Sequence, residues 1–258
     1  MYKKLVEKMR ERGNVAIAFS GGVDSSLVAK SAKDAGIKCV AITFASPLFP
    51  KRELENSMKI AKEIGIKQIV LFDNDIDEKV RKNPANRCYY CRKFGAKRLK
   101  EVAIKNGISN FADGMNADDV KNPYYHGVKA SNEEGIWHPL AELNIGKEEA
   151  RKIAREVGLS NWNKPSNACL ASRIPYGEEI TLEKLEMIEE GEKYLTTFFE
   201  QVRLRVYRKI AKIEVLPKDI KKAVEMREKI VKKLREIGFS HVSIDLEGYR
   251  EGSMNALK

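Results

Sequence analysis

The chain has 258 residues, of which 43% are hydrophobic and 33% are charged, and its formal net charge is +11. This composition is typical of a soluble globular protein with one large or two smaller domains, and it excludes a low-complexity protein. No stretch approaches the roughly 18 apolar residues that span a membrane, and no apolar signal-peptide core follows the N-terminus, so we expect a cytoplasmic protein.

The positive charge is concentrated towards the C-terminus. Between Arg203 and Ser240 there are 13 Lys or Arg residues and 5 Asp or Glu residues. A basic surface favours nucleic acids or phosphorylated small molecules as ligands, but it is also ordinary in Lys- and Glu-rich proteins of thermophiles. No aromatic residues interleave with these charges in a base-stacking pattern, so tRNA binding is an alternative and not the first expectation.

The first predicted strand leads directly into a glycine-rich turn. Residues 15–19 are an apolar run typical of a buried strand, and residues 27–35 predict a helix that stops at Gly36. Between them lies Ser-Gly-Gly-Val-Asp-Ser-Ser, residues 20–26. The glycines let the backbone approach a ligand, and the N-terminus of the following helix offers unpaired N–H groups to an anion. Asp24 beside a polyphosphate predicts a Mg²⁺ ligand.

This turn is not a Walker A loop, because it lacks the Gly-Lys-Ser/Thr ending. It resembles the PP-loop of the ATP pyrophosphatases, the superfamily of GMP synthetase, NAD synthetase and the tRNA thiolases. The resemblance implies that the loop holds the β,γ-pyrophosphate of ATP while the α-phosphorus is attacked, which forms AMP. The alternative is an ordinary glycine turn followed by a helix cap. The predicted ATP-binding residues are Ala18, Ser20, Gly21, Gly22, Val23, Asp24, Ser25, Ser26, Thr43 and Gly114.

Three further apolar runs predict strands at residues 38–44, 67–72 and 109–112, with helices between them. This alternation predicts an α/β fold with a parallel sheet and helices on both faces. Ligands of such sheets bind beyond the C-terminal ends of the strands, where Thr43–Ser46 would form a wall for adenine and ribose. Asp113 and Asn116 follow the last of these strands, and they either join the site or simply shape the turn.

The second half of the chain contains two segments without regular periodicity. Residues 120–135 are polar, and we expect a mobile loop that closes over substrate. A helix at 147–157 follows, and then residues 164–177, which are crowded with reactive and phosphate-binding residue types. This second segment is therefore predicted to be an active-site loop.

The pattern changes again from Thr181. A helix to about residue 198, strands at 201–207 and 211–216, a long basic helix at 219–237 and a strand at 241–246 predict a small α+β domain. We therefore expect a PP-loop domain at residues 1–179 and a C-terminal substrate or oligomerisation domain at residues 180–258.

The four cysteines suggest metal chemistry more than disulfides in a cytosolic chain. Cys88 and Cys91 form a CxxC whose spacing lets both thiolates face one metal, and Cys169 is the third candidate ligand. Three thiolates suit a [4Fe-4S] cluster with one open iron. The alternatives are a redox pair, a zinc site completed by His126 or His138, or unconnected thiols. Cys39 lies within a predicted strand and is interpreted as a buried apolar residue.

The SGGVDSS loop, NRCYYC, DGMNADD, KPSNACLASRIPYG and the paired runs VRLRV and AKIEV together resemble the LarE family of ATP-dependent sulfur transferases. The resemblance covers nearly the whole chain, and ACLASRIPYG is its most specific part. It implies adenylylation of a carboxylate of a pyridinium mononucleotide and replacement of AMP by sulfur, in the biosynthesis of the nickel-pincer nucleotide cofactor. It also implies a sulfide or other sulfur donor and a homo-oligomer.

Two versions of the sulfur source occur in this family. Members that have only the cysteine matching Cys169 surrender its sulfur and are left with dehydroalanine, whereas others also carry the CxxC. In that second version, which this sequence matches, cysteines corresponding to Cys88, Cys91 and Cys169 hold a [4Fe-4S] cluster with an additional sulfide. The resemblance thus implies ATP, Mg²⁺ and the cluster as cofactors.

Five residues are predicted to bind the substrate or its phosphate. Arginine binds phosphate with two parallel hydrogen bonds, and Arg203 and Arg205 lie two apart on a strand, so they share a face. The full set is Ser172, Arg173, Glu192, Arg203 and Arg205, with Glu192 included by resemblance. Cys169, Asp24 and Arg173 are the predicted catalytic residues.

Other functions remain open on these residues. The same chemistry on a tRNA base would make the protein a tRNA thiolase, and the PP-loop alone would suffice for an amide synthetase that uses ammonia. A non-enzymatic ATP-binding or iron–sulfur scaffold is the remaining alternative.

Overall fold

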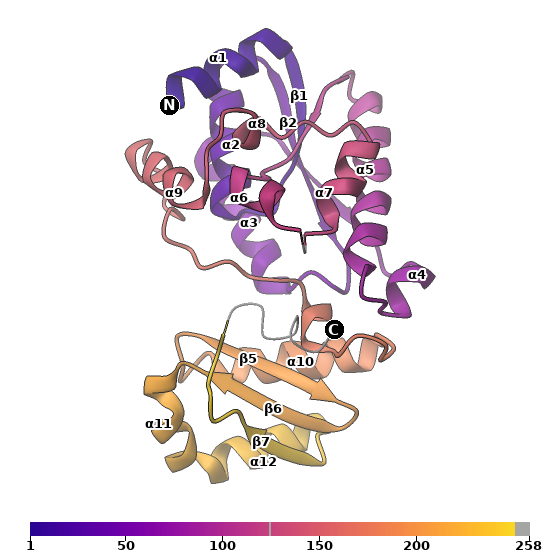
Figure 1. Cartoon of the computed structure of the whole chain (residues 1–258), viewed down its shortest axis with the longest axis vertical. Coiled ribbons are helices and arrows are strands. Elements are labelled where there is room, and N and C mark those ends of the chain that lie inside the picture. Colours follow the sequence, from indigo (N-terminus) through magenta and orange to yellow (C-terminus); the bar gives the residue numbers. More distant parts are fainter. Residues whose placement is uncertain (124, 251–258) are drawn as a thin grey trace. The chain divides into compact units, whose positions relative to one another are not determined.

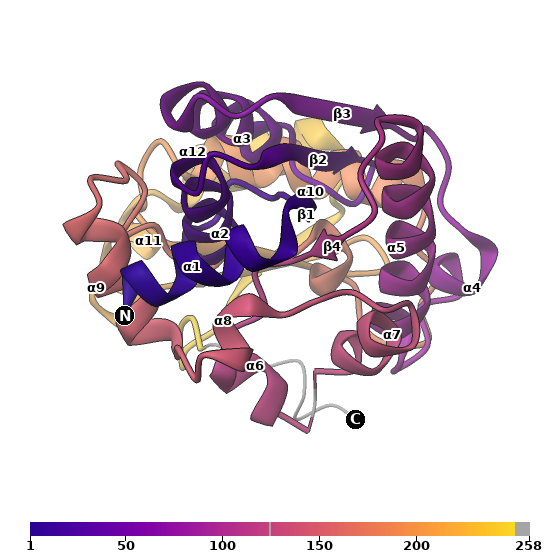
Figure 2. The same ribbon diagram turned by 90° about the horizontal axis from the view of Figure 1, so that it is seen from above.

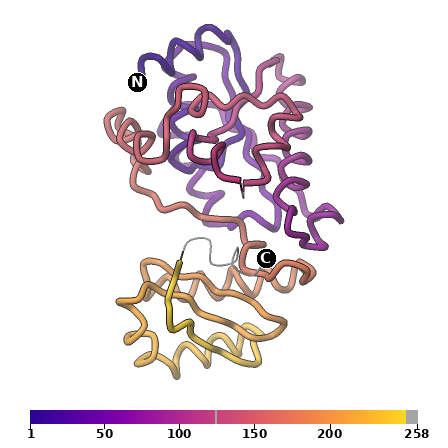
Figure 3. The backbone as a smooth tube through the Cα atoms, in the orientation of Figure 1, coloured from indigo at the N-terminus to yellow at the C-terminus, as the bar shows by residue number. Residues whose placement is uncertain are grey.

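The structure, a computed structural model, describes residues 1–123 and 125–250, and these form two compact units (Figure 1). Unit 1 comprises residues 1–77 and 86–167, and unit 2 comprises residues 78–85 and the chain from Ala168 onward. The chain therefore passes between the units three times, a path that Figure 3 follows by colour. The chain enters unit 2 for the last time at Ala168, which precedes the predicted domain boundary between residues 179 and 180. The separate roles of the two domains stay a prediction.

The elements of unit 1 alternate between strands and helices along most of its length. In chain order they are α1 (Tyr2–Arg12), β1 (Asn14–Ala18), α2 (Val23–Asp34), β2 (Lys38–Ala45), α3 (Lys51–Ile64), β3 (Gln68–Phe72), α5 (Arg87–Lys105), β4 (Phe111–Ala112), α6 (Ala117–Lys121), α7 (Gly127–Glu133), α8 (Pro139–Glu142) and α9 (Lys147–Glu156).

The four strands of unit 1 form a parallel sheet in the order β3-β2-β1-β4. One apolar core packs α1, α2, α3 and α9 against one face, and a second core packs α5 against the other, with α7 beside α5 (Figure 2). The core residues of β1 and β2 are apolar on both faces, as expected for strands covered on both sides. The predicted α/β fold class is confirmed.

Two predictions of local structure in unit 1 differ from the structure. The last strand covers only Phe111–Ala112 because the side chain of Asn14 accepts the N–H of Ser109 at 2.8 Å, where a strand pairing was expected. The segment 120–135, predicted to be irregular, contains α7, whose Ala130 and Ser131 are buried. Tyr124, part of that expected loop, lies outside the described residues.

Unit 2 contains a second, smaller sheet covered by helices. Its elements are α4 (Glu78–Arg81), the 3₁₀ turn η1 (Leu170–Arg173), α10 (Leu182–Leu195), β5 (Val202–Tyr207), β6 (Ile210–Val215), η2 (Pro217–Asp219), α11 (Ile220–Glu225), α12 (Arg227–Ile237) and β7 (His241–Ile244). Strands β5 and β6 are antiparallel, whereas β6 and β7 are parallel. Helices α10 and α12 contact each other and pack against β5 and β7.

The predicted basic helix of residues 219–237 is interrupted. It begins as η2 and α11 and resumes as α12, with Met226 at the junction. The interruption turns the apolar side of each piece towards the unit's interior, where Ala223 from α11 and Ile230 and Leu234 from α12 are buried. Within the described part of the chain, no helix combines the length and apolar character needed to span a membrane.

Candidate active site

The glycine-rich loop lies where β1 ends and α2 begins. The N–H of Phe19 continues the sheet by donating to the carbonyl of Ile42 at 2.8 Å, and α2 starts at Val23 with Gly22 as its N-cap. Gly21 has a φ of +69°, and a Cβ at this position would lie 2.6 Å from the Cα of Ser57. Only glycine therefore fits both the backbone conformation and the close approach of α3.

Short-range hydrogen bonds hold the loop in shape. The hydroxyl of Ser25 donates to the carbonyl of Gly22 at 3.2 Å and accepts the N–H of Ser20 at 3.3 Å. The N–H of Gly22 donates to the hydroxyl of Ser20 at 3.3 Å. The first-turn N–H groups of α2 have no carbonyl one turn earlier to accept them, so the loop presents donors and a positive dipole end to an anion.

Asp24 is a half-buried residue whose carboxylate lacks a full set of partners. Its Oδ2 accepts Nδ2 of Asn116 at 3.4 Å, whereas its Oδ1 is buried and has no hydrogen-bond partner among the described residues. Burial and the neighbouring charge of Asp119 raise the pKa of Asp24 to about 6. A buried carboxylate oxygen without a donor is costly unless a cation coordinates it, so the donor set fits Mg²⁺.

The turn after β4 packs directly on this loop. Asn116 caps α6 by accepting the N–H groups of Asp118 and Asp119, and the Asp119 carboxylate accepts the N–H of Asn116 in return. A Cβ on Gly114 would lie 2.5 Å from the backbone nitrogen of Ser25. The turn therefore fixes the start of α2, and Asn116 both shapes the turn and contacts Asp24.

Asp113 is buried in the same turn, but its oxygens are fully used. It accepts Nη2 of Arg92 at 2.6 Å, the N–H of Met115 at 3.0 Å and the hydroxyl of Ser131 at 3.5 Å, and Nδ1 of His138 lies 2.7 Å away. Burial alone would raise the pKa of Asp113, but the Arg92 charge and the His138 contact lower it. Asp113 thus joins α5, α7 and α8 to the sheet edge, which is a structural role.

Thr43 lies within β2, which continues to Ala45, and its buried hydroxyl is engaged inside the protein. It donates to the carbonyl of Phe19 at 2.7 Å and accepts Nε2 of Gln68 at 2.8 Å. The contact fixes the residue just before the loop. Ala18 ends β1 and is half-buried. Their contact with a nucleotide stays a prediction.

The cysteines occupy both units. Cys88 and Cys91 are exposed in the first two turns of α5, where residues three apart lie about 5–6 Å apart on one helix face. Cys169 is half-buried in unit 2 as the N-cap of η1, and Cys39 is half-buried in β2. Across residues 1–123 and 125–250, no three Cys, His, Asp or Glu side chains gather into a metal site.

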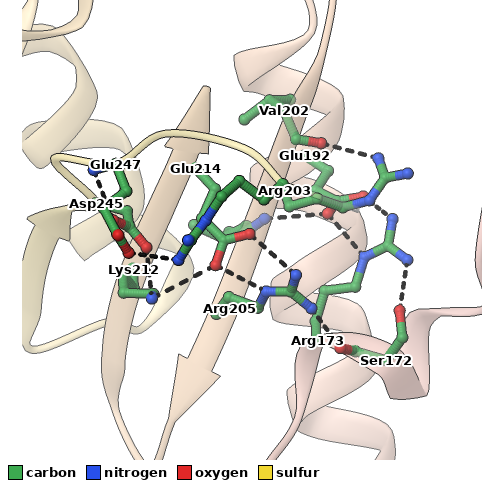
Figure 4. A network of polar contacts seen from close by, with 12 residues as sticks. Ser172, Arg173, Glu192, Val202, Arg203, Arg205, Lys212, Glu214, Asp245 and Glu247 are labelled. Carbon is green, nitrogen blue, oxygen red and sulfur yellow. Dashed lines mark hydrogen bonds and ion pairs between the residues drawn. The ribbon is translucent and has the colours of Figure 1, made fainter. Parts of the chain in front are cut away.

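Arg173 organises the backbone around Cys169 in unit 2, and Figure 4 shows its guanidinium beside Glu192 and Ser172. Its fully buried guanidinium donates to both carboxylate oxygens of Glu192 at 2.8 Å. It also donates to the carbonyl of Ala168 at 2.6 Å, the carbonyl of Cys169 at 3.1 Å and the hydroxyl of Ser172 at 3.0 Å. The charge of Arg173 is therefore balanced by Glu192, and its geometry holds the turn that carries the thiol.

Arg205 makes a similar set of contacts, with a carboxylate and a backbone carbonyl. It donates to both oxygens of Glu214, at 3.0 and 2.9 Å, and to the carbonyl of Ser172 at 2.6 Å (Figure 4). Arg203 donates to its neighbouring carbonyl at Val202, and its guanidinium lies 5.2 Å from the centre of the Tyr249 ring. Burial and the charges of Arg173 and Arg205 lower the pKa of Arg203. The structure thus gathers the five predicted substrate-binding residues in unit 2.

Several residues of these networks were not found from the sequence. Glu214 is opposite Arg203 in the β5–β6 ladder, so hairpin pairing would have placed it near the arginines. Asn161 and Glu53 contact residues more than 100 positions away, and no local pattern signals them.

The chain is similar to several known proteins. Residues 3–83 match the family model of asparagine synthase. An uncharacterized protein of Synechocystis sp. is 40% identical over 99% of this chain and 98% of its own length. The pyridinium-3,5-bisthiocarboxylic acid mononucleotide synthase of Lactiplantibacillus plantarum is 35% identical over 97% of this chain and 92% of its own length. The tRNA-specific 2-thiouridylase MnmA of Treponema denticola is 25% identical, over 73% of this chain and 62% of its own length.

Proposed function

The chain belongs to the LarE family of ATP-dependent sulfur transferases, and from this we propose that it activates a carboxylate of a pyridinium mononucleotide with ATP and replaces the AMP with sulfur. The relative from Lactiplantibacillus plantarum is named as a bisthiocarboxylic acid mononucleotide synthase, which supports this substrate class.

The buried Oδ1 of Asp24 is the observation that carries the ATP half of the proposal. It lies at the start of α2, where first-turn N–H groups point outward, and it lacks a protein partner among the described residues. A Mg²⁺ ion bound by Asp24 would neutralise phosphate charge. The substrate carboxylate attacks the α-phosphorus, the bond to the bridging oxygen breaks, and pyrophosphate leaves while the loop N–H groups stabilise its charge.

The sulfur step follows from the poor leaving ability of a carboxylate oxygen. Once the carboxylate is an acyl adenylate, a sulfur nucleophile attacks its carbon, the carbon–oxygen bond to AMP breaks, and a thiocarboxylate forms. Arg173 fixes the backbone of Ala168 and Cys169 and so orients the Cys169 thiol. Arg203, whose guanidinium lies 5.2 Å from the centre of the Tyr249 ring, is the proposed contact for substrate phosphate, because arginine binds phosphate with two parallel hydrogen bonds.

The sulfur source is proposed to be a [4Fe-4S] cluster held by Cys88, Cys91 and Cys169. Two exposed thiols one turn apart on α5 fit two ligands of such a group. These three cysteines would hold the cluster, which would supply the sulfur for the transfer. The alternative is that Cys169 gives up its own sulfur.

Anaerobic reconstitution with iron and sulfide tests this proposal. We expect a brown protein with about four irons per chain, and we expect Cys88→Ala to lose the colour. Cys39→Ala is the matched control, because Cys39 lies within β2, and it should keep the cluster. A colourless protein with one zinc would contradict the cluster, and loss of one sulfur and two hydrogens from Cys169 after one turnover would establish the sacrificial route.

A tRNA substrate is the second candidate, favoured by the similarity to MnmA and by the positive charge between Arg203 and Ser240. It requires tRNA binding that weakens steeply with salt. Pyrophosphate release stimulated by tRNA, and not by pyridinium carboxylates, would replace the first proposal with this one.

A further inference from the structure

Strand β3 forms one edge of the parallel sheet, and within the described part of the chain only its β2 side has a neighbouring strand. The sheet order is β3-β2-β1-β4, and Figure 2 shows β3 at the outer margin of the sheet. All residues of β3 are at least partly exposed, and Phe72 is 72% exposed. Four of its five residues are apolar. An apolar edge of this kind is a ready template for pairing with another strand.

The hydrogen bonds between β3 and β2 determine which backbone groups of β3 face outward. The carbonyl of Lys67, just before the strand, accepts the N–H of Ala41 at 2.9 Å. Just after the strand, the N–H of Asp73 donates to the carbonyl of Ala45 at 3.0 Å. Successive residues of a strand direct their N–H and C=O groups to opposite sides, so three residues direct these groups away from β2: Gln68, Val70 and Phe72. None of these backbone groups bonds to another described residue.

The two ends of β3 carry opposite charges. Lys67 is exposed at the start, and Asp73 is half-buried at the end, where its Oδ1 accepts the N–H of Asp75 at 3.5 Å. Across residues 1–123 and 125–250, neither Lys67 nor Asp73 has an ion-pair partner. A strand with a positive start and a negative end is complementary to a second copy of itself that runs in the opposite direction.

We propose that β3 pairs with β3 of a second copy of this chain, antiparallel about a two-fold axis at Val70. In this register Val70 lies opposite Val70 of the second copy, and Gln68 lies opposite Phe72. These are the residues whose backbone groups face outward, so every outward N–H and C=O group gains a partner. Lys67 then lies opposite Asp73 of the second copy at both ends of the contact. Any other register leaves outward groups unpaired or separates the two charges.

The pairing lies away from the proposed ATP site. The PP-loop follows β1, and β2 separates β1 from the edge strand β3. The two-fold axis reverses the strand direction, so the PP-loops of the two copies lie at opposite edges of the joined sheet. The inference therefore goes beyond the proposed sulfur transfer and does not depend on it. It assigns a self-association surface to unit 1, in addition to the C-terminal domain for which oligomerisation was predicted.

Reversal of the two charges tests the pairing. Lys67→Glu and Asp73→Lys each place like charges opposite each other at both ends of the contact. Each variant alone should therefore dissociate with a constant about tenfold or more above that of the wild type. An equimolar mixture of the two variants has opposite charges at both ends again, so its dissociation constant should lie within about threefold of the wild-type value. Sedimentation equilibrium of the full chain, up to about 100 µM, measures these constants.

Lys3→Glu is the matched control. Lys3 is an exposed lysine on α1, and its substitution changes the net charge by the same amount as Lys67→Glu. Self-association of this variant should equal that of the wild type, alone and when mixed with Asp73→Lys. We expect pyrophosphate release per chain to be unchanged in all three variants, because none of these residues lies at the PP-loop.

A zero-length carbodiimide cross-link between Lys67 and Asp73 locates the contact. Within one chain these residues are separated along an extended strand by about 20 Å, which is too far for such a link. In a mixture of unlabelled and heavy-nitrogen-labelled protein, we expect cross-linked peptides that combine both labels. Lys67→Glu should abolish them.

Three results would overturn the proposal: a wild-type chain that stays monomeric, self-association that the charge reversals do not change, or no cross-link between Lys67 of one chain and Asp73 of another. Cross-links from Lys67 or Asp73 to residues 251–258 of the same chain would assign this edge to the C-terminal end of the chain and would also overturn it. A failure of sulfur transfer would contradict only the proposed function, because no measurement of the pairing requires activity.

Discussion

Two carboxylates lie at the same edge of the parallel sheet and have opposite environments. Asp24 follows β1 and Asp113 follows β4, and these strands are paired. Burial and Asp119 raise the pKa of Asp24 to about 6, and its Oδ1 has no partner among the described residues. The pKa of Asp113 is lowered, because Arg92 and His138 outweigh its burial.

Under the proposed function, the difference separates a residue that binds a cation from a residue that builds the fold. An incompletely satisfied buried carboxylate costs stability, and such a cost is typical of functional sites. A satisfied one, with donors from three helices and a turn, stabilises the arrangement around it. Substitutions at the two positions should therefore change different properties of the protein.

The largest effect is expected for Asp24→Asn. The amide has nearly the same shape but contributes no charge for Mg²⁺, so pyrophosphate release should fall about a thousandfold, or about 4 kcal/mol of barrier. The control is Asp34→Asn at the other end of α2, where the carboxylate pairs with Lys30 at 2.6 Å. This control should stay within about twofold of the wild type. A similar rate for the two variants in a Mg²⁺-dependent assay would contradict the role of Asp24.

Asp113→Asn should instead unfold the protein more easily. The amide has no negative charge to pair with Arg92, and it replaces one of the two accepting oxygens by a donor, so we expect a loss of about 3 kcal/mol in the free energy of unfolding. Urea denaturation measures this loss. The control is Glu133→Gln. Glu133 forms a half-exposed ion pair with Lys93, which lies on α5 as Arg92 does, so this variant should lose no more than about 0.5 kcal/mol in the free energy of unfolding.

An equal loss in these two variants would remove the distinction between buried and exposed pairs. A loss of activity in folded Asp113→Asn as large as that of Asp24→Asn would move Asp113 into the catalytic machinery. Either result would contradict the structural role of Asp113 in this comparison.

The sequence predicted one side of this comparison much better than the other. The PP-loop was found because its glycines, its serines and Asp24 are neighbours in the chain, and each contributes chemistry visible in the residue type. The sequence does not decide the role of Asp113, because its partners are distant in the chain. Arg92 lies on an earlier helix, and Ser131 and His138 lie in later segments. The sequence pattern of a strand followed by Asp-Gly is the same whether the aspartate binds a ligand or accepts hydrogen bonds from neighbouring helices.

The same limit explains the other differences. The strands and most helices followed from apolar periodicity, because burial on a sheet or helix face repeats at short intervals. Asn161 and Glu53 depend on contacts across more than 100 residues, and α7 depends on packing against α5. Periodicity carries no information about such contacts.

The smallest predicted effect concerns the stability of the protein as pH changes, without nucleotide or Mg²⁺. Because the pKa of Asp24 is raised in the folded state to about 6, the folded protein binds a proton more tightly than the unfolded chain, whose Asp pKa is about 4. Ionisation of Asp24 therefore lowers the free energy of unfolding as the pH rises from about 4 to about 6, and the full loss is reached above about pH 6. Asp24→Asn removes it, so this variant should be about 2 kcal/mol more stable than the wild type at pH 8.

Thermal or urea unfolding at a series of pH values measures this difference. The advantage of Asp24→Asn should shrink below pH 6 and vanish near pH 4, where both proteins carry a neutral side chain at position 24. Adding Mg²⁺ and ATP at pH 8 should stabilise the wild type and not the variant, since only the carboxylate gains a cation. A stability difference that is independent of pH would mean that the burial of Asp24, and not its charge, is responsible, and the contrast with Asp113 would then lose its electrostatic basis.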